Sequence, residues 1–466
     1  MRSVTALTTD GGDTGLKGDD LDALAAQLRG PLLTPELDGY DAGRQVWNGM
    51  IDRRPALIAR CTGTADVKAC VDFAREHALL VSVKGGGHNI AGKSVCEGGF
   101  AIDLSLMKNT QVDAARLRAR AGGGTKWGDF DHETQAFGLA TTGGTNTDTG
   151  IAGLTLGGGI GWLAGRYGLA CDNLTSANVV LADGRVVTAS PTANDDLFWG
   201  LRGGSGNFGI VTSFEYQLHP VAGVLAGPVF HPFSAAAAVF GFYRDFVAAV
   251  PDELVTLAGF LHTPEGVPVA GVIGCWNGPF DAGERAVQPM RTFGAPLVDE
   301  IQPMPYAAIQ AALDPALPPG GRYYLKGHLM TEVSDEAIAT LVDHYARVPS
   351  PRSVIVLQQI GNAANRVDPM ATAFSYRNAR YDLVIVSVWS DPAEDATNIR
   401  WARELHDAME PFSLRAVYVN SVGDDDMAAA VRASYRPETF DRLAELKARY
   451  DPTNFFRLNP NIPPSA

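Results

Sequence analysis

Glycine is concentrated in two segments of this chain, and this concentration restricts the possible folds more than any other feature. Residues 85–87 are a Gly-Gly-Gly run directly before His88, and glycine recurs throughout residues 142–168, TGGTNTDTGIAGLTLGGGIGWLAGRYG. Glycine allows positive φ and lets the main chain approach another group without a Cβ in between. Both segments are therefore predicted to be loops that lie close to a ligand or to another part of the chain.

The residues around the first glycine segment predict a βαβ unit. ALIARC (56–61) and LLVSVK (79–84) are apolar runs of strand length, and apolar side chains recur at helical spacing between them. The glycine segment follows the second strand at once, and another strand, FAIDLS, is predicted at 100–105.

A change in composition near residue 220 predicts a second domain. After His219-Pro220, a helix is predicted at 234–250 and alternating strands at 267–276 and 381–389, while glycine-rich loops become rarer. A helix at 440–450 is expected to end at Asp451-Pro452. The extended, proline-rich tail after it is expected to dock on the rest of the molecule.

The overall composition limits the partners of this chain. A formal charge of -14 and a pI of about 5.1 argue against binding to nucleic acid or to an anionic membrane. The chain has neither a signal-peptide core near residue 1 nor a run of ~18 apolar residues, so a cytoplasmic protein is expected. Five cysteines without CxxC or Cys/His spacing predict no metal site and no disulfide framework. A monomer or a homodimer is expected.

Two short motifs suggest nucleotide binding, but their surroundings argue against it. Residues 87–94, GHNIAGKS, match a phosphate-loop pattern, yet no helix is predicted after them to receive a phosphate. Residues 204–209, GSGNFG, match a dinucleotide pattern, but a helix precedes them and a strand follows, the reverse of the usual order. A nucleotide hydrolase stays open as an alternative, because the first match is complete.

Four motifs, in order along the chain, resemble one flavoprotein family. VSVKGGGHNIAGKSV (81–95), the second glycine segment with its flanks (141–173), LFWGLRGGSGNFGIVTSFEYQLHP (197–220) and YDPTNFFRLNPNIPP (450–464) resemble the berberine-bridge-enzyme-like branch of the vanillyl-alcohol-oxidase flavoproteins, close to the 6-hydroxy-D-nicotine oxidase type. The resemblance extends from about Trp47 to the end of the printed sequence.

The resemblance implies an α+β fold with a two-subdomain FAD-binding domain and a substrate domain whose antiparallel sheet is covered by helices. We expect an N-terminal lead-in at 1–40, the FAD-binding domain at 41–219, the substrate-binding domain at 220–415, and a C-terminal segment at 416–466 that returns to the FAD-binding domain.

In this family the histidine of the (R/K)-x-G-G-H loop bonds to the 8α-methyl group of FAD, and His88 occupies that place. Many relatives add a bond from a cysteine eleven residues before the GGG of the second segment, but Asn146 stands there, so a single covalent attachment follows. Cys171 does not match the cysteine site, and Cys96 is a remote alternative. The other residues that the resemblance assigns to the cofactor are Lys84, Gly85, Gly86, Gly87, Asn89, Gly92, Thr142, Gly143, Thr149, Gly150, Gly153, Leu154, Gly157, Gly158, Gly159, Gly161, Ile210, Val211, Asn420, Asn459 and Asn461.

The catalytic residues are less well specified. Thr149 stands where relatives place the residue beside flavin N5, and its small hydroxyl leaves room for oxygen. A general base must reach the substrate O–H or N–H, and a tyrosine whose pKa is lowered by a lysine can serve. The candidates are Tyr323, Tyr324, Lys326, Tyr376 and Tyr418.

The resemblance implies an oxidase that transfers a hydride from a C–H next to an alcohol or amine to FAD, which O2 then reoxidises to give H2O2. A small organic substrate of secondary-metabolite or alkaloid type is expected. A monooxygenase is the first alternative, which labelled oxygen in the product would reveal, and a flavoprotein that binds without turnover is another. A nucleotide hydrolase would be colourless.

Overall fold

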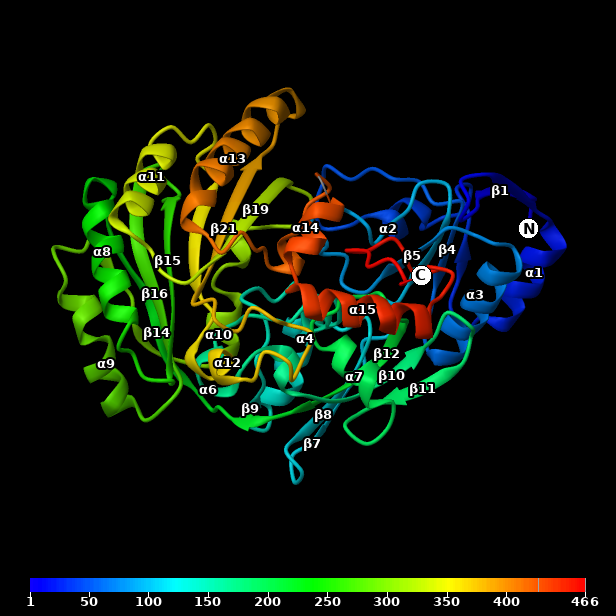
Figure 1. The fold of residues 1–466 in the computed structure, drawn as a ribbon, viewed down its shortest axis with the longest axis horizontal. Helices are drawn as coiled ribbons and strands as arrows, with labels where there is room; N and C mark the ends of the chain where they lie inside the picture. The colour runs from blue at the N-terminus through cyan, green and yellow to red at the C-terminus, as the bar shows by residue number, and fades with distance from the viewer. Residues whose placement is uncertain (426, 466) are drawn as a thin grey trace.

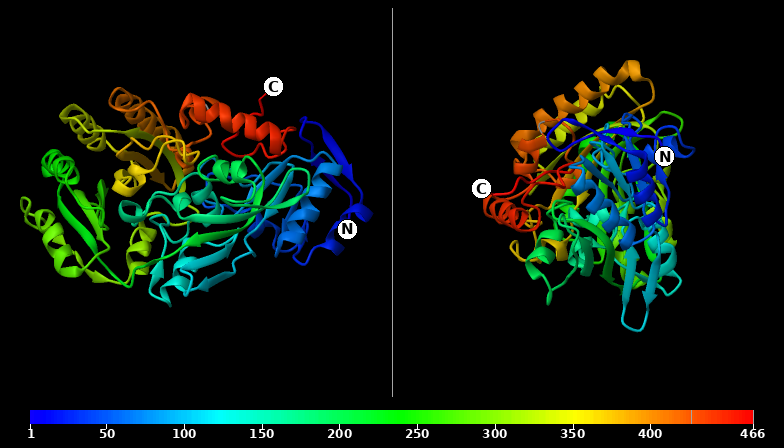
Figure 2. Two further views of the ribbon diagram at one scale, coloured as in Figure 1. Left: turned by 60° about the horizontal axis from the view of Figure 1, so that its bottom comes forward. Right: turned by 90° about the vertical axis from the view of Figure 1, so that its right-hand side faces the viewer.

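The computed structural model describes residues 1–425 and 427–465, whose strands form three main sheets with helices packed around them. Figure 1 shows an elongated molecule with the largest sheet at one end and the two smaller sheets at the other. The chain fills the end with the smaller sheets first, then the large sheet, and finally returns to the first end (Figures 1 and 2).

The first small sheet contains the strands on either side of the first glycine segment. Its order is β3 (Leu32–Leu33), β4 (Leu57–Arg60), β6 (Phe100–Asp103) and β5 (Val81–Lys84), with β4 and β5 both parallel to β6. The predicted βαβ unit therefore forms through α3 (Thr64–Glu76), and β6 lies between its two strands. The elements before residue 40 join the same core: β1 (Val4–Leu7), β2 (Asp13–Leu16) and α1 (Gly18–Gln27).

The second small sheet is antiparallel, in the order β11 (Val186–Ala189), β10 (Leu174–Val180), β12 (Ile210–Gln217), β8 (Arg118–Gly122) and β7 (Thr110–Asp113). The hairpin between β10 and β11 turns at Asp183-Gly184, where Gly184 has φ +82°. Helix α2 (Tyr40–Arg44) packs on β4 of the first small sheet, whereas α4 (Trp127–Gln135) and α7 (Asp195–Leu201) contact strands of the second. The short helices α5 (Ile151–Leu156) and α6 (Ala164–Tyr167) lie within the second glycine segment. A pair of short strands, β9 (Leu139–Ala140) and β13 (His219–Pro220), lies where the chain leaves for the large sheet.

The large sheet is antiparallel throughout its described strands. These are β14 (Val224–Pro232), β15 (Leu254–His262), β16 (Pro268–Trp276), β17 (Val298–Asp299), β18 (Gln302–Met304), β19 (Arg322–Met330), β20 (Val354–Gln359) and β21 (Tyr381–Trp389). Helices α8 (Ala236–Val247), α9 (Phe280–Thr292), α11 (Asp335–Tyr345) and α13 (Asp395–Met409) cover its outer face, as Figure 1 shows. Two short helices, α10 (Tyr306–Ala311) and α12 (Asn362–Arg366), lie near the smaller sheets.

Strand β21 shows how the large sheet divides its side chains between two faces. Successive residues of a strand point to opposite faces. Tyr381, Leu383 and Ile385 accordingly pack into the core beneath the helices, whereas Asp382 and Val384 face the smaller sheets. The uncovered face of this sheet thus becomes one wall of the space between the two ends of the molecule.

The C-terminal segment returns to the smaller sheets through α14 (Met427–Ala433), α15 (Pro437–Tyr450) and the tail, residues 451–465. The tail is fixed at Asn207, whose Nδ2 donates to the Pro460 carbonyl at 3.0 Å and whose Oδ1 accepts from the Ile462 N–H at 2.9 Å. The fully buried Lys447 adds bonds to the carbonyls of Asn207 and Phe456. The docking predicted for this tail is confirmed. Among the described residues, no helix combines the length and the apolar character that crossing a membrane requires.

Candidate functional site

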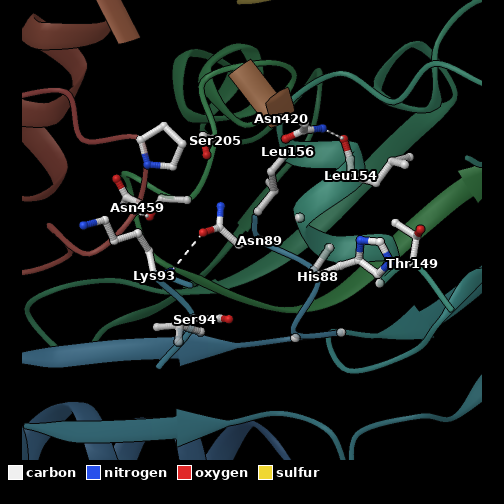
Figure 3. A pocket seen from close by; sticks show the side chains of 18 of the residues that line it. His88, Asn89, Lys93, Ser94, Thr149, Leu154, Leu156, Ser205, Asn420 and Asn459 are labelled. Atoms are coloured by element: carbon white, nitrogen blue, oxygen red, sulfur yellow. Dashed lines mark hydrogen bonds between the residues drawn. The ribbon is translucent and has the colours of Figure 1, made fainter. Parts of the chain in front are cut away.

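A cavity of about 350 Å³ lies between the smaller sheets and the large one. Its walls come from segments far apart in the sequence, namely both glycine segments, residues 205–211, strands β20 and β21, residues 418–421 and the tail. Figure 3 shows the labelled side chains of several of these segments around this one space. Sequence-predicted residues in the walls are Gly85, Gly86, Gly87, His88, Asn89, Thr149, Gly150, Gly153, Leu154, Ile210, Val211, Tyr418, Asn420 and Asn459.

The imidazole of His88 stands on the wall of this cavity and is held neutral. Its ring stacks on Trp47 with centroids 4.2 Å apart. Burial lowers the pKa of His88 to about 4. The ion pair of Asp148 and Lys126 has smaller effects, because the carboxylate of Asp148 raises this pKa and the ammonium group of Lys126 lowers it. A neutral imidazole keeps a free ring lone pair at neutral pH, so His88 is available as a nucleophile.

The loop that carries His88 is fixed from behind. The Trp47 N–H donates to the Gly87 carbonyl at 3.0 Å, and the Asn89 side chain accepts from the Lys93 N–H at 2.9 Å (Figure 3). Lys84 lies behind the wall, where its Nζ bonds the Gly43 carbonyl and lies 3.1 Å from Asp103. Gly92, with φ +67°, also packs behind the wall, against Ile51. Lys84 and Gly92 therefore shape the loop.

The two glycine segments meet each other beside His88. A Cβ added to Gly86 would lie 2.5 Å from the Gly150 Cα, and one on Gly150 would lie 2.6 Å from the Gly86 nitrogen. Only glycine fits at either position. This approach brings Thr149 to the same wall as His88, as Figure 3 shows.

The rest of the second glycine segment forms a layer behind the cavity. A Cβ on Gly157 would lie 2.1 Å from the Asn420 side chain, and the Gly159 N–H donates to the Tyr418 hydroxyl at 2.8 Å. Asn420 in turn donates to that hydroxyl at 2.7 Å and to the Leu154 carbonyl at 3.1 Å (Figure 3). The other predicted cofactor residues in this layer are Thr142, Gly143, Gly158 and Gly161, which pack against neighbouring chain segments. Among them Gly158 lies against Tyr418, since a Cβ added to it would be 3.4 Å from the Tyr418 ring, and Tyr418 and Asn420 themselves reach the cavity.

Two glycines show that the cavity has room for a ligand that the chain itself does not fill. A Cβ added at Gly153 or at Gly206 would meet no described atom within 4 Å, although both residues line the cavity. Buried polar atoms without a partner among the described residues also line it, including Ser94 Oγ and Asn459 Oδ1. Such atoms cost free energy unless a bound group satisfies them. Both features fit a large polar ligand such as FAD.

The tail contributes differently through its two predicted residues. Asn459 lines the cavity and donates to the Gly206 carbonyl at 3.1 Å. Asn461 lies beyond the wall, with its buried Oδ1 unpaired among the described residues.

Most of the candidate bases lie away from the cavity. Tyr324 and Lys326 are on the helix-covered face of β19, where both contact Asp425. Tyr323 faces the other way, but it stacks on Trp47 and donates its hydroxyl to the Pro318 carbonyl. Tyr376 lies beside Arg436, outside the cavity. The structure does not bring these four side chains to the site.

Tyr418 and Thr149 are the candidates that do line the cavity. Burial raises the pKa of Tyr418 well above its usual value, although the Gly159 N–H opposes this rise. A tyrosine with a raised pKa holds its proton firmly, which makes Tyr418 better suited to hydrogen bonding than to proton removal.

Gln358 and Asp382 are two cavity residues that the sequence analysis did not select. They are direct partners across β20 and β21, and both face the cavity. Asp382 is 2% exposed, and burial raises its pKa to about 8. An acidic residue inside an otherwise apolar, alternating strand, YDLVIVSVW, was the available signal.

Both discounted motifs also contribute to the walls. Lys93 and Ser94 of the GHNIAGKS motif and Ser205, Gly206 and Gly209 of the GSGNFG motif line the cavity. Residues 95–99 run without helix into β6, so the phosphate-loop fold is excluded at this place. The residues of both motifs thus line one cavity, although the folds commonly associated with these patterns are not formed.

Asn146, at the place of the second attachment in relatives, is bonded to the large-sheet end of the molecule. Its Nδ2 donates to Asp314 at 3.4 Å, and the Thr147 N–H donates to the same carboxylate at 3.0 Å. Cys96 and Cys171 are both buried outside the cavity lining. Within the described residues, three or more His, Cys, Asp or Glu side chains nowhere gather as a metal ion would require.

Comparison with known families finds two matches. A family described as FAD binding domain matches residues 55–190, and one described as berberine and berberine like matches residues 417–463. The (R)-6-hydroxynicotine oxidase of Paenarthrobacter nicotinovorans is 32% identical over 458 residues, which cover 95% of this chain and 98% of the relative. A FAD-linked oxidoreductase of Dictyostelium discoideum is also 32% identical, over 90% of this chain and 91% of the relative.

Solved structures agree with these relatives. The crystal structure of 6-hydroxy-D-nicotine oxidase from Arthrobacter nicotinovorans has a TM-score of 0.86 and 30% identity, covering 94% of this chain and 98% of that chain. Xylooligosaccharide oxidase from Myceliophthora thermophila has a TM-score of 0.83 at 23% identity, covering 96% and 100%, and supports the fold alone. The α+β fold class expected from the sequence is confirmed.

Proposed function

The chain belongs to the berberine-bridge-enzyme-like family of FAD-linked oxidoreductases, and from this premise we propose that it is an oxidase that carries FAD on His88 through a single covalent bond. The observation that carries the proposal is the neutral imidazole on the wall of a cavity into which the two glycine segments and the tail converge. Asn146 at the second attachment position supports a single bond.

FAD, when bound, supplies a hydride acceptor that passes two electrons on to O2 and so yields H2O2. The residues of the chain hold and enclose it. The main chain at Gly85–Gly87 and Gly150 approaches closely, Gly153 and Gly206 leave space, and the tail closes the remaining wall. Thr149 beside His88 offers a small hydroxyl group and leaves room for oxygen.

The substrate of this oxidase is a small organic molecule of secondary-metabolite or alkaloid type. The relative from Paenarthrobacter is named for a hydroxylated nicotine, which supports a substrate of that size. The uncovered face of the large sheet, through Gln358, Asp382 and Val384, supplies the wall on the substrate side.

Mass spectrometry of the denatured protein tests the attachment. The purified wild type should be yellow and should keep the mass of one FAD after denaturation in acid. His88→Ala should release any FAD on denaturation, while His132→Ala, which alters an exposed histidine of α4, should retain it. FAD that is freed from the wild type, or a colourless wild type that cannot be reconstituted, would contradict the proposal.

Peroxide production tests the reaction. Alcohols and amines of secondary-metabolite size, together with 6-hydroxynicotine, should be screened with the wild type. At least one should yield H2O2 with consumption of O2 and bleaching of the flavin under anaerobic conditions. Retention of labelled oxygen in the product would instead identify a monooxygenase.

A further inference from the structure

We propose that Asp382 removes the proton from a substrate hydroxyl group and that Gln358 donates a hydrogen bond to the same oxygen, so that this enzyme oxidises an alcohol. This inference rests on the proposed function, since it concerns the substrate side of the same cavity. It replaces the tyrosine and lysine candidates, most of which lie elsewhere in the structure.

Strand register places the two side chains next to each other. Gln358 of β20 is paired directly with Asp382 of β21 in an antiparallel ladder. Side chains of directly opposed residues share a face and have Cβ atoms about 5 Å apart. Both residues line the cavity, as does Val384, the next residue of β21 on this face. The two polar groups can therefore contact one ligand atom between them.

Neither group has its hydrogen bonds satisfied by the protein. The Oδ1 atom of Asp382 and the Nε2 atom of Gln358 are both buried, and neither finds a partner among the described residues. Burial of an unpaired carboxyl or amide group costs free energy, so such groups persist where a ligand completes their hydrogen bonds. One is an acceptor and the other a donor, which defines a complementary pair.

This pair selects an alcohol over an amine. A hydroxyl oxygen can donate its proton to Asp382 and accept from Gln358 through its lone pairs at the same time. An aliphatic amine is an ammonium ion at neutral pH, and burying its charge costs free energy in a cavity whose Asp382 carboxyl is mostly protonated. A single hydroxyl group completes both.

The surroundings of Asp382 suit proton transfer near neutral pH. Burial raises the pKa of its carboxyl to about 8, close to the operating pH at which a general base is most effective. Three other titratable groups line the same cavity. One is Tyr418, whose pKa the charge of Asp382 helps to raise, and the others are His88 and Lys93 on other walls. On the neighbouring strand Leu329 is opposite Asp382, and the adjacent His328 turns away to the His406 carbonyl.

In the proposed step, the substrate O–H bond breaks and its proton forms an O–H bond with the Asp382 carboxylate. The hydrogen of the adjacent C–H bond leaves with both electrons of that bond to FAD, the oxidant named in the proposed function. The oxygen electron pair then forms the C=O bond, and Asp382 later returns its proton to water.

A pH titration of the flavin absorbance in the holoenzyme tests the placement of Asp382 without any substrate. A carboxyl that gains charge beside the flavin ring changes the visible spectrum of the flavin. A titration of the wild type from about pH 6 to about pH 9 should therefore show a spectral transition near pH 8. Asp382→Asn should abolish this transition. Asp131→Asn is the matched control, because Asp131 is another buried carboxyl with a raised pKa, away from the cavity, and should retain it.

Kinetics test the role. With an alcohol that the peroxide screen identifies, Asp382→Asn should lower kcat/KM by about 10²–10⁴-fold and remove the rise in rate through pH 8. Gln358→Met should mainly raise KM and keep the spectral transition. Benzyl alcohol and benzylamine form a size-matched pair, of which the alcohol should reduce the flavin faster.

The failure of this inference can be told from failure of the proposed function. A yellow, covalently loaded Asp382→Asn variant that keeps the spectral transition, or that turns over the alcohol as the wild type does, would overturn the inference alone. Faster reduction of the flavin by benzylamine would overturn the choice of an alcohol. A colourless wild type would overturn the proposed function.

Discussion

The imidazole of His88 and the carboxyl of Asp382 face the same cavity. Burial lowers the pKa of the imidazole and raises that of the carboxyl, so it favours the neutral form of both groups. His88, with a pKa of about 4, is uncharged at pH 7, and Asp382, with a pKa of about 8, is mostly protonated there. At neutral pH these two groups therefore add little charge to the cavity, which favours a neutral substrate over an ion.

With FAD attached to His88 as proposed, the lowered pKa of the ring sets the pH range in which the bond can form. Attachment requires the unprotonated ring, so the rate of FAD incorporation into the apoprotein should stay constant down to about pH 5 and fall as the pH approaches 4. Timed mass spectrometry during reconstitution measures this rate. A decline centred near the ordinary histidine value of 6.5 would show that the ring is more hydrated than the structure implies.

The buried carboxyl of Asp131 should make the stability of the fold depend on pH. Its pKa is raised from 3.8 to about 7 by burial, so the folded state binds more protons than the unfolded state between these values. Stability from this group is fully present below pH 3.8 and is lost as the pH rises to 7, at about 1.4 kcal/mol per pH unit. Asp131→Asn removes this loss, so its thermal midpoint relative to the wild type should increase steadily from pH 4 to pH 7.

That prediction requires the Gln310 contact to survive, because the Gln310 Nε2 donates to Asp131 Oδ2 at 2.9 Å. An asparagine can accept the same bond through its carbonyl oxygen. A midpoint difference that is constant with pH would indicate lost packing instead of a relieved charge.

Among the structural elements, the two glycine segments allow the effects of folding and of cofactor binding to be measured separately. Gly86→Ala forces a Cβ against the Gly150 backbone and should cost about 1–3 kcal/mol, lowering the thermal midpoint of the apoprotein. Gly153→Ala meets open space in helix α5 and should gain roughly 0.5–1 kcal/mol in the apoprotein.

Stability and FAD content should change differently in Gly86→Ala and Gly153→Ala. Gly153→Ala should fold well but hold less FAD than the wild type, since its methyl group enters the cavity. The ratio of flavin absorbance to protein absorbance, measured beside thermal midpoints of the apoproteins, distinguishes them. Normal FAD content in Gly153→Ala would place the ligand elsewhere.

The elements themselves could largely be predicted from local patterns. The strands at 79–84 and 381–389 and the helix that ends before Asp451 all form as expected. The facing of β19 could not be predicted, because its charged or polar residues Arg322, Lys326 and His328 share one face, and the alternation does not reveal whether that face meets the cavity or the helices. Tyr324 and Lys326 consequently lie on the helix-covered face, one residue out of phase with the cavity-facing side.

At the scale of the whole molecule, a buried ion pair joins the large-sheet end to the smaller sheets. Arg377, 1% exposed, donates to both oxygens of Asp172 at 2.7 and 2.8 Å. Asp172→Asn should cost about 3–5 kcal/mol, because it leaves the buried guanidinium without its counter-charge. Arg377→Met added to Asp172→Asn should recover part of this loss.

Thermal denaturation of the single and double variants tests the pair. Asp343→Asn breaks the exposed pair between Asp343 and Arg347 and should change stability by less than about 1 kcal/mol. Equal effects of Asp172→Asn and Asp343→Asn would show that the buried pair does not join the two ends.

The four ordered motifs predicted one shared binding site because together they resemble one flavoprotein family, and residues of all four line the same cavity. Asp382 and Gln358 could not be predicted in the same way. Their proximity depends on the pairing of β20 with β21, which are separated by a long loop, and on which face the helices cover. Neither property is encoded in the short windows around them.

The docking of the tail on Asn207 also bears on the order of events during biosynthesis. Ribosomes make His88 early, whereas Phe456, Leu458 and Asn459, which complete the wall, emerge several hundred residues later. A nascent chain that lacks the tail therefore has a cavity with one wall missing. Enclosure of the prosthetic group by this wall therefore requires that translation has passed the tail.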